Sequence, residues 1–262
     1  MMRLVTAVRF DRELKVGRNK PVILTCEDES GSTIEVVAKF AHRCERGTNA
    51  LVAESLSAMF AADLDLPVPE PFIVSIDPDL VNTMMGHIPG HRPADGTIPA
   101  FGSKLLPPAY SVLPQGKTLP DSLVQTAFEI IAFDVLIQNS DRLPNNPNCL
   151  TDGQQLAIID HELAFTTGII GWRPPWEPDS LGYLRPPTEH LFFNSVRGRI
   201  IDLDRLTGAV EAVTDERLNE YLAALSKPWI EPASQEQHMI QQLRSMRTHI
   251  SDIVTQLREA LR

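Results

Sequence analysis

Three polar side chains with a defined spacing stand in the middle of the chain. Asp141 is followed five residues later by Asn146, and Asp160 comes at the end of the short apolar run Leu156–Ile159. One carboxylate can orient or deprotonate an attacking hydroxyl, while an amide and a second carboxylate can hold Mg²⁺ on the phosphates of ATP. The types and spacing of these residues therefore predict phosphoryl transfer.

A lysine and a glutamate upstream fit the same chemistry. Lys39 lies at the end of a predicted strand within the β-branched run Thr33–Phe40, and Glu54 lies fifteen residues later in a predicted helix. A strand lysine paired with a helix glutamate can hold the α- and β-phosphates of ATP. Taken separately, the two are an ordinary surface lysine and a solvated helix residue. Glu54 has apolar neighbours in the sequence, and an unpaired carboxylate is costly to bury, so the pairing is favoured.

A short loop precedes the first strong strand pattern. The segment Val16–Pro21 contains Gly17 and the basic residues Arg18 and Lys20. Backbone N–H groups in such a loop can cradle phosphates, with help from the two cations. A single glycine is equally typical of an ordinary turn, and both interpretations stay open at this point.

Composition excludes several classes of protein. The formal net charge of −10 argues against binding nucleic acid by broad phosphate neutralisation. The N-terminus has no long apolar segment, and no run of 18 apolar residues occurs, so neither a secretory signal nor a membrane span is expected. The three cysteines are widely spaced without a Cys-x-x-Cys pair, which favours reduced thiols over a zinc site. We expect a cytoplasmic protein.

The elements that must position these residues can be outlined from hydrophobic patterns. The first forty residues are predicted as strands, with Pro21–Thr25 and Thr33–Phe40 forming a hairpin. A helix is predicted from Gly47 to about Ala62, and a strand over Phe72–Ile76. The segment 86–120 is rich in glycine and proline, which is typical of a linker or hinge.

The second half of the chain is predicted to be mainly helical. Asp121 is a plausible N-cap for a helix to about Gln138 that is apolar nearly all round and therefore buried. Further helices are predicted near Leu203, over Asp215–Leu225, and from a capping box at Ser234 and Gln237 to Leu261. The segment 168–187 is loop-like, and its Trp172 and Trp176 are better explained by packing of the loop than by a substrate platform.

The motifs VVAKF, ALVAESLSAMFAADLDLPVPEPFIV, FGSKL, DRLPNNPNCL and AIIDHELAF together resemble the HipA-like kinase family over roughly residues 15–165. The resemblance implies a two-lobed, protein-kinase-like architecture that uses ATP and Mg²⁺. It gives Asp141 the role of the catalytic aspartate and makes Asn146 and Asp160 the Mg²⁺ ligands. Lys39 becomes the phosphate-binding lysine, with Glu54 as its partner.

The resemblance also extends to residues with no signal of their own. Phe101–Leu105, with Gly102 and Lys104, falls at the hinge that contacts adenine. Arg142 and Asn148 are implied to orient the catalytic loop. Two departures stand out, because Ser140 replaces the arginine that many kinases have before the catalytic aspartate, and Asp160-His161-Glu162 replaces Asp-Phe-Gly.

The predicted fold class is α+β with two lobes. Residues 1–98 are expected to form a small β-rich lobe that binds the nucleotide, and residues 99–262 a larger, mostly helical lobe with the catalytic loop. The predicted function is an ATP- and Mg²⁺-dependent serine/threonine protein kinase, with a protein acceptor favoured over a metabolite. Two alternatives stay open: a pseudokinase that binds nucleotide as an interaction module, and a small-molecule phosphotransferase similar to aminoglycoside or sugar kinases.

Overall fold

The computed structural model describes residues 2–15, 19–85, 98–166, 173–187, 189–200, 202–230 and 235–262. The chain divides into two compact units, each assembled from separate stretches. The first unit consists of Met1–Met59, Pro69–Leu106 and Glu220–Glu236, and the second of Phe60–Val68, Pro107–Asn219 and Gln237–Arg262. The N-terminal part is rich in strands and the C-terminal part in helices, as expected for the α+β class.

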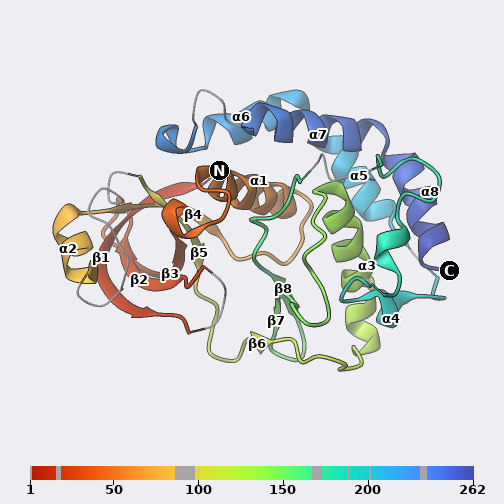
Figure 1. The fold of residues 1–262 in the computed structure, drawn as a ribbon, viewed down its shortest axis with the longest axis horizontal. Coiled ribbons are helices and arrows are strands. Elements are labelled where there is room, and N and C mark those ends of the chain that lie inside the picture. The colour runs from red at the N-terminus through yellow and green to blue at the C-terminus, as the bar shows by residue number, and fades with distance from the viewer. Residues whose placement is uncertain are drawn as a thin grey trace. The chain divides into compact units, whose positions relative to one another are not determined.

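Five strands of the first unit form a closed barrel (Figure 1). They are β1 (Arg3–Glu13), β2 (Val22–Glu27), β3 (Thr33–Lys39), β4 (Pro71–Ile76) and β5 (Ala100–Lys104). The order is β1-β2-β3-β5-β4, and parallel pairing of β4 with β1 closes the ring. Side chains alternate between the inside and the outside of a barrel, so every second residue of β4 is buried, as are Val36 and Ala38 of β3. The predicted β2–β3 hairpin and the strand at β4 are confirmed.

Among the described residues, two α-helices lie between strands of the barrel in the chain order, one before β4 and one after it. The predicted helix from Gly47 is confirmed as α1 (Thr48–Asp63), which is buried on nearly all sides. The second is α2 (Pro78–Met85), whose Val81 and Met84 join the core of the barrel.

The prediction of a linker over 86–120 was wrong for β5. Residues 86–97 lie outside the described part, but Ala100–Lys104 pairs with β3 on one side and β4 on the other. Glycine and proline near a short strand weaken its pattern, which is why it was missed. The expected lobe boundary after residue 98 separates β5 from its sheet, whereas the first unit continues to Leu106 and also includes Glu220–Glu236.

The central helix of the second unit is α3 (Asp121–Leu136), and its all-round burial is confirmed. The predicted cap is wrong, because Pro120 occupies the N-cap position and makes no side-chain hydrogen bond there. Asp121 is instead exposed in the first turn and pairs with Arg199. A three-stranded sheet in the order β6-β7-β8 is built from β6 (Ser111–Val112), β7 (Cys149–Thr151) and β8 (Leu156–Ile158).

Five α-helices follow in the described residues of the C-terminal part. They are α4 (Phe193–Val196), α5 (Asp204–Ala212), α6 (Asp215–Ala223), α7 (Glu236–Thr248) and α8 (Ile250–Ala260). The predicted helices near Leu203 and from Asp215 are confirmed as α5 and α6. The final helix was wrongly predicted as continuous, because the backbone leaves the helical region at His249 and separates α7 from α8.

The break lies beside the proline-rich loop. The ring of Trp176 stacks on the ring of His249, with centroids 4.2 Å apart and planes inclined by 15°. The loop thus packs onto the helices through Trp176, as the packing interpretation expects, while Trp172 and Ser234 lie outside the described residues. Across the described ranges, none of the helices is both long and apolar enough to cross a membrane.

Close packing inside the barrel requires a glycine at position 102. A Cβ atom added there would lie 2.6 Å from Cγ2 of Val74 and 3.6 Å from the Cβ atoms of Phe72 and Val36. All three neighbours are fully buried, so none can move away without repacking the core. The substitution Gly102→Ala is expected to lower the free energy of unfolding by about 1–3 kcal/mol, measured by chemical denaturation.

The control is Gly208→Ala in α5, where an added Cβ meets nothing within 4 Å. Because alanine favours a helix over glycine, this variant is expected to be unchanged or more stable, by up to about 1 kcal/mol. Equal stability of the two variants would contradict the packing argument.

Candidate active site

The loop between α3 and β7 folds back on itself around Asp141. Leu143 and Asn146 exchange two backbone hydrogen bonds of 3.1 and 3.0 Å, which make a tight turn. The turn returns Asn146 to Asp141, and its Nδ2 donates to Asp141 Oδ2 at 2.8 Å. Asn148 Nδ2 donates to the same oxygen at 3.1 Å. The five-residue spacing therefore allows the tight turn to bring the side-chain amide of Asn146 within hydrogen-bonding distance of the Asp141 carboxylate.

The surroundings of Asp141 raise the pKa of its carboxyl. Half-burial raises the pKa of the Asp141 carboxyl above its ordinary value, and the negative charge of Asp160 acts in the same direction. The amide donors of Asn146 and Asn148 oppose this shift without cancelling it. An ionised carboxylate whose pKa is raised can accept a hydrogen bond from a hydroxyl and take up its proton more readily than an ordinary aspartate.

Asp160 directly follows β8 and Ile159, as the sequence predicts. Its backbone is left-handed, with φ of 63°, a conformation that aspartate tolerates better than most residues. Ile159 N donates to Asn148 O at 3.0 Å, so the segment before Asp160 is joined to the end of the loop that carries Asp141. The negative charge of Asp160 contributes to the raised pKa of Asp141.

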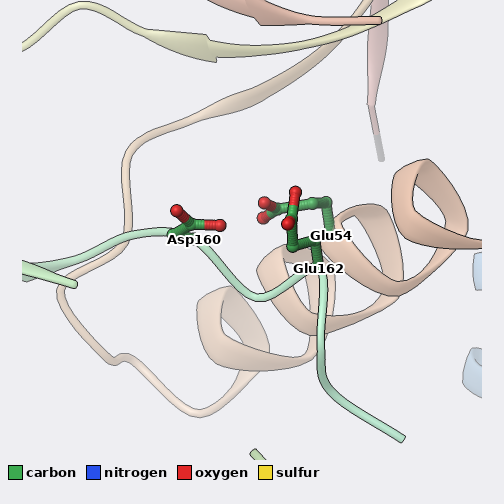
Figure 2. A group of neighbouring side chains, drawn as sticks. All are labelled: Glu54, Asp160 and Glu162. Atoms are coloured by element: carbon green, nitrogen blue, oxygen red, sulfur yellow. The ribbon is translucent and has the colours of Figure 1, made fainter. Parts of the chain in front are cut away.

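Glu162 adds a second carboxylate that sequence reasoning did not assign. Figure 2 shows Asp160 and Glu162 on the segment that follows β8. A carboxylate oxygen of Asp160 lies within 4.8 Å of one of Glu162. Oxygen atoms of carboxylates and amides are the ligands that Mg²⁺ prefers, so Asp160, Glu162 and Asn146 have suitable chemistry.

The residue between these carboxylates is buried. His161 is 1% exposed, and its ring meets Phe133 of α3 edge to face, with centroids 5.8 Å apart. An aromatic pair of this geometry stabilises the contact beyond simple burial. The departure from Asp-Phe-Gly thus keeps a buried ring that anchors the Asp160 segment on α3.

The buried side chain of Arg142 connects the loop that carries Asp141 to the segment before Asp160. Its side chain is fully buried, and its Nε donates to Asp134 Oδ2 at 2.6 Å while Nη2 donates to Oδ1 at 3.1 Å. Its Nη1 donates to the carbonyl oxygen of Asn148 and, at 3.4 Å, to that of Ile159. One guanidinium therefore holds both the loop that carries Asp141 and the segment before Asp160.

Asp134 and His190 are the residues that sequence reasoning missed. Besides Arg142, Asp134 accepts hydrogen bonds from Asn139 Nδ2 at 2.8 Å and from His190 Nε2 at 3.0 Å. Burial alone would raise the pKa of Asp134, but the charge of Arg142 and the hydrogen bonds hold it below its ordinary value. The sequence did contain one signal for Asp134, since an acidic residue in a buried helix needs a partner. No pattern in the sequence marked His190 as a residue of the site.

The predicted nucleotide residues of the first unit include an ion pair. Lys39 Nζ donates to Glu54 Oε1, and Glu54 is 2% exposed. Glu54 lies on α1 (Figure 2). The strand register sets Lys39 opposite Phe101 and Phe101 opposite Ile73, so these three residues share one face of the sheet. The arrangement offers a cation beside apolar side chains, a combination suited to phosphates and a purine base.

Three of the other residues that the sequence predicts to bind the nucleotide are described in the structure: Gly102, Lys104 and Lys20. Gly102 faces Val36, Phe72 and Val74 in the barrel, and the exposed Lys104 lies opposite Val36, so neither shares the face of Lys39. Lys20 has a left-handed backbone, with φ of 42°, and its carbonyl accepts from Arg43 Nη1 at 2.7 Å. Gly17 lies outside the described residues.

Comparison with known proteins identifies the family. The model of the HipA-like kinase family matches residues 8–170, which is more than half of the chain. The chain belongs to the HipA-like kinase family. Among solved structures, the crystal structure of the Helicobacter pylori proinflammatory kinase CtkA has a similar fold, with a TM-score of 0.51 and 11% identity over 99% of this chain and 98% of that one. No curated protein sequence matches the chain.

The match confirms the family suggested by the motifs. A β-rich N-terminal part and a helical C-terminal part are shared with a kinase structure, and together they support a kinase-type phosphotransferase. Kinases in general use ATP and a divalent metal.

The buried ion pair of the second unit has a measurable consequence. Asp134→Asn leaves the guanidinium of Arg142 buried without its charge partner, and breaking such a pair costs about 3–5 kcal/mol. We expect a loss of this size in the free energy of unfolding, measured with urea. The control Asp121→Asn removes a pair in which Asp121 is 89% exposed, and about 0–1 kcal/mol is expected. Similar losses in both variants would contradict the assignment.

The same pair predicts a pH dependence. Because the pKa of Asp134 is lower in the folded than in the unfolded protein, its ionised form stabilises the fold above the unfolded value of about 4, and this contribution declines as the pH falls towards the folded value. The difference in unfolding free energy between wild type and Asp134→Asn should be constant from about pH 5 to 8 and narrow by about 1 kcal/mol at about pH 3. A difference that stays constant down to pH 3 would show that the pKa of Asp134 is not lowered.

Proposed function

We propose that this protein is an ATP- and Mg²⁺-dependent kinase that phosphorylates a serine or threonine hydroxyl of a protein. The observation that carries the proposal is the pair of amides from Asn146 and Asn148 on one oxygen of Asp141, in a loop that Arg142 ties to the segment before Asp160. Membership in the HipA-like kinase family supports it.

In this proposal Asp141 orients the acceptor. Both amide hydrogen bonds end on Oδ2, and Oδ1 is the oxygen that would accept the hydrogen bond of the incoming hydroxyl. The hydroxyl oxygen then bonds to the γ-phosphorus as the bond from that phosphorus to the β,γ-bridging oxygen breaks and ADP leaves. The hydroxyl proton passes to Asp141, whose raised pKa makes it a suitable acceptor.

The metal would be held by Asn146 and Asp160. The Nδ2 of Asn146 is bound to Asp141, which leaves Oδ1 of that amide as the atom for a cation. Asp160 supplies a carboxylate, with Glu162 beside it. When bound, Mg²⁺ neutralises the charge that the phosphates develop during transfer.

The nucleotide would be bound by residues of the first unit. Lys39, oriented by Glu54, would contact the α- and β-phosphates, and Phe101 with Ile73 on the same sheet face would contact the base. In this proposal the first unit acts as the nucleotide lobe and the second as the catalytic lobe, which is the two-lobed organisation that the sequence predicts.

The decisive experiment separates binding from transfer. We expect calorimetry to show Mg²⁺-dependent ATP binding, and labelled ATP to show phosphate transfer to protein serine or threonine. Asp141→Ala should lower the transfer rate by about 10²–10⁴-fold and leave ATP affinity nearly unchanged, because a group that acts on the acceptor proton contributes that much. Asp160→Ala should lose the metal-dependent part of ATP binding.

Asp121→Asn serves as the control, because this exposed carboxylate lies at the start of α3, and it should behave as wild type in both assays. Transfer by Asp141→Ala at the wild-type rate would disprove the assignment of the loop. ATP binding by the wild type without turnover on protein or metabolite acceptors would favour the pseudokinase, and turnover on a metabolite alone the small-molecule phosphotransferase.

A further inference from the structure

The network around Asp134 joins three segments that are distant in the sequence. Asp134 comes from α3, Arg142 from the catalytic loop, and His190 from the segment just before α4. Their exposures are 1%, 0% and 5%, so the network is shielded from water. Asp134 accepts four hydrogen bonds, two of them from Arg142, which accounts for all its lone pairs.

The proton positions on His190 follow from its neighbours. Phe192 N donates to His190 Nδ1 at 3.2 Å, so Nδ1 is an acceptor and carries no hydrogen. The proton of the neutral ring is therefore on Nε2, which donates to Asp134 Oδ2 at 3.0 Å. Burial lowers the pKa of His190 in spite of the nearby carboxylate, which agrees with a neutral ring. His190 is thus a dedicated donor to one oxygen.

That oxygen is the one that also receives Arg142. Both His190 Nε2 and Arg142 Nε end on Asp134 Oδ2, so the histidine fixes the carboxylate against which the guanidinium is oriented. The segment is tied to the loop a second time, because Leu191 N donates to the carbonyl oxygen of Arg142 at 2.9 Å. A buried hydrogen-bond network with every member satisfied holds its groups in a single arrangement.

The consequence reaches the reacting groups through Arg142. Its Nη1 holds the carbonyl of Asn148, whose side chain donates to Asp141, and the carbonyl of Ile159, which precedes Asp160. A rotation of the guanidinium would shift both carboxylates together. A displacement of about 1 Å is enough to cost about 10²-fold in rate.

We propose that His190 is a positioning residue, which orients Arg142 through Asp134 and thereby sets the catalytic loop and the Asp160 segment in register. The inference rests on the proposed kinase function for its kinetic consequence but not for its structural one. It makes the segment before α4 a determinant of the active arrangement, although this segment supplies none of the reacting groups.

The test compares substitutions of different hydrogen-bonding capacity. His190→Gln can place an amide N–H₂ where Nε2 stands, whereas His190→Asn is too short to reach Asp134, and His190→Leu removes the donor altogether. His190→Leu is expected to lower kcat by about 10–100-fold while KM for ATP changes less than about two-fold. His190→Gln should recover most of the loss. The control His249→Leu changes a partly buried histidine that stacks on Trp176 outside the Asp134 network, and it should retain the wild-type kcat.

Hydrogen exchange provides a readout that does not need activity. In His190→Leu, peptides covering residues 139–149 and 156–166 should exchange faster than in wild type, and in His190→Gln they should not. Unchanged kcat and unchanged exchange in His190→Leu would overturn the proposal. If His190→Leu does not fold, the pair Gln and Asn decides, because equal exchange and equal kcat in these two variants would also overturn it.

A failure of the kinase function is distinguishable from a failure of this inference. Wild-type protein that transfers no phosphate would contradict the proposed function, while faster exchange in both peptides of His190→Asn but not of His190→Gln would still support the positioning role.

Discussion

The second unit depends on the buried ion pair between Asp134 and Arg142. Removing two charges from water costs several kcal/mol for each ion, and only near-complete hydrogen bonding offsets that cost. Here the carboxylate accepts four hydrogen bonds and the guanidinium also donates to two backbone carbonyls. The pair explains why the apolar helix α3 carries an aspartate, why the loop after it is ordered, and why the segment before α4 returns to this point.

The first unit depends on a steric constraint instead. Closure of a five-stranded barrel brings β5 so near to β4 that only glycine fits at position 102. The same closure sets the face on which Lys39, Phe101 and Ile73 lie. Gly102, which the family resemblance assigns to the adenine-contacting hinge, is therefore required by packing as well. In this unit the position of the residues that would bind the nucleotide is a consequence of strand register.

The structure also concentrates unusual backbone conformations around the site. Positive φ angles occur at Gln138, Asn148, Asp160 and Phe165, which lie at or near the ends of the Asp141 loop and of the segment after β8. Such conformations cost of order 1–3 kcal/mol each and persist where the surroundings over-determine them. The Arg142 hydrogen bonds to Asn148 and Ile159, together with the 2.7 Å bond from Phe165 N to Ile137 O, provide that restraint.

The sequence by itself determined the family, the strand hairpin, the helices α1, α3, α5 and α6, and the spacing of Asp141, Asn146 and Asp160, because these depend on local periodicity and on short motifs. The sequence did not predict β5, because Gly102 interrupts the apolar alternation that is typical of a strand. It also did not predict the break at His249, where the ring of Trp176 stacks on the histidine. Only the tertiary structure brought Asp134 and His190 together with Arg142. A buried polar network joins residues according to their distance in space, and no spacing along the chain records that distance.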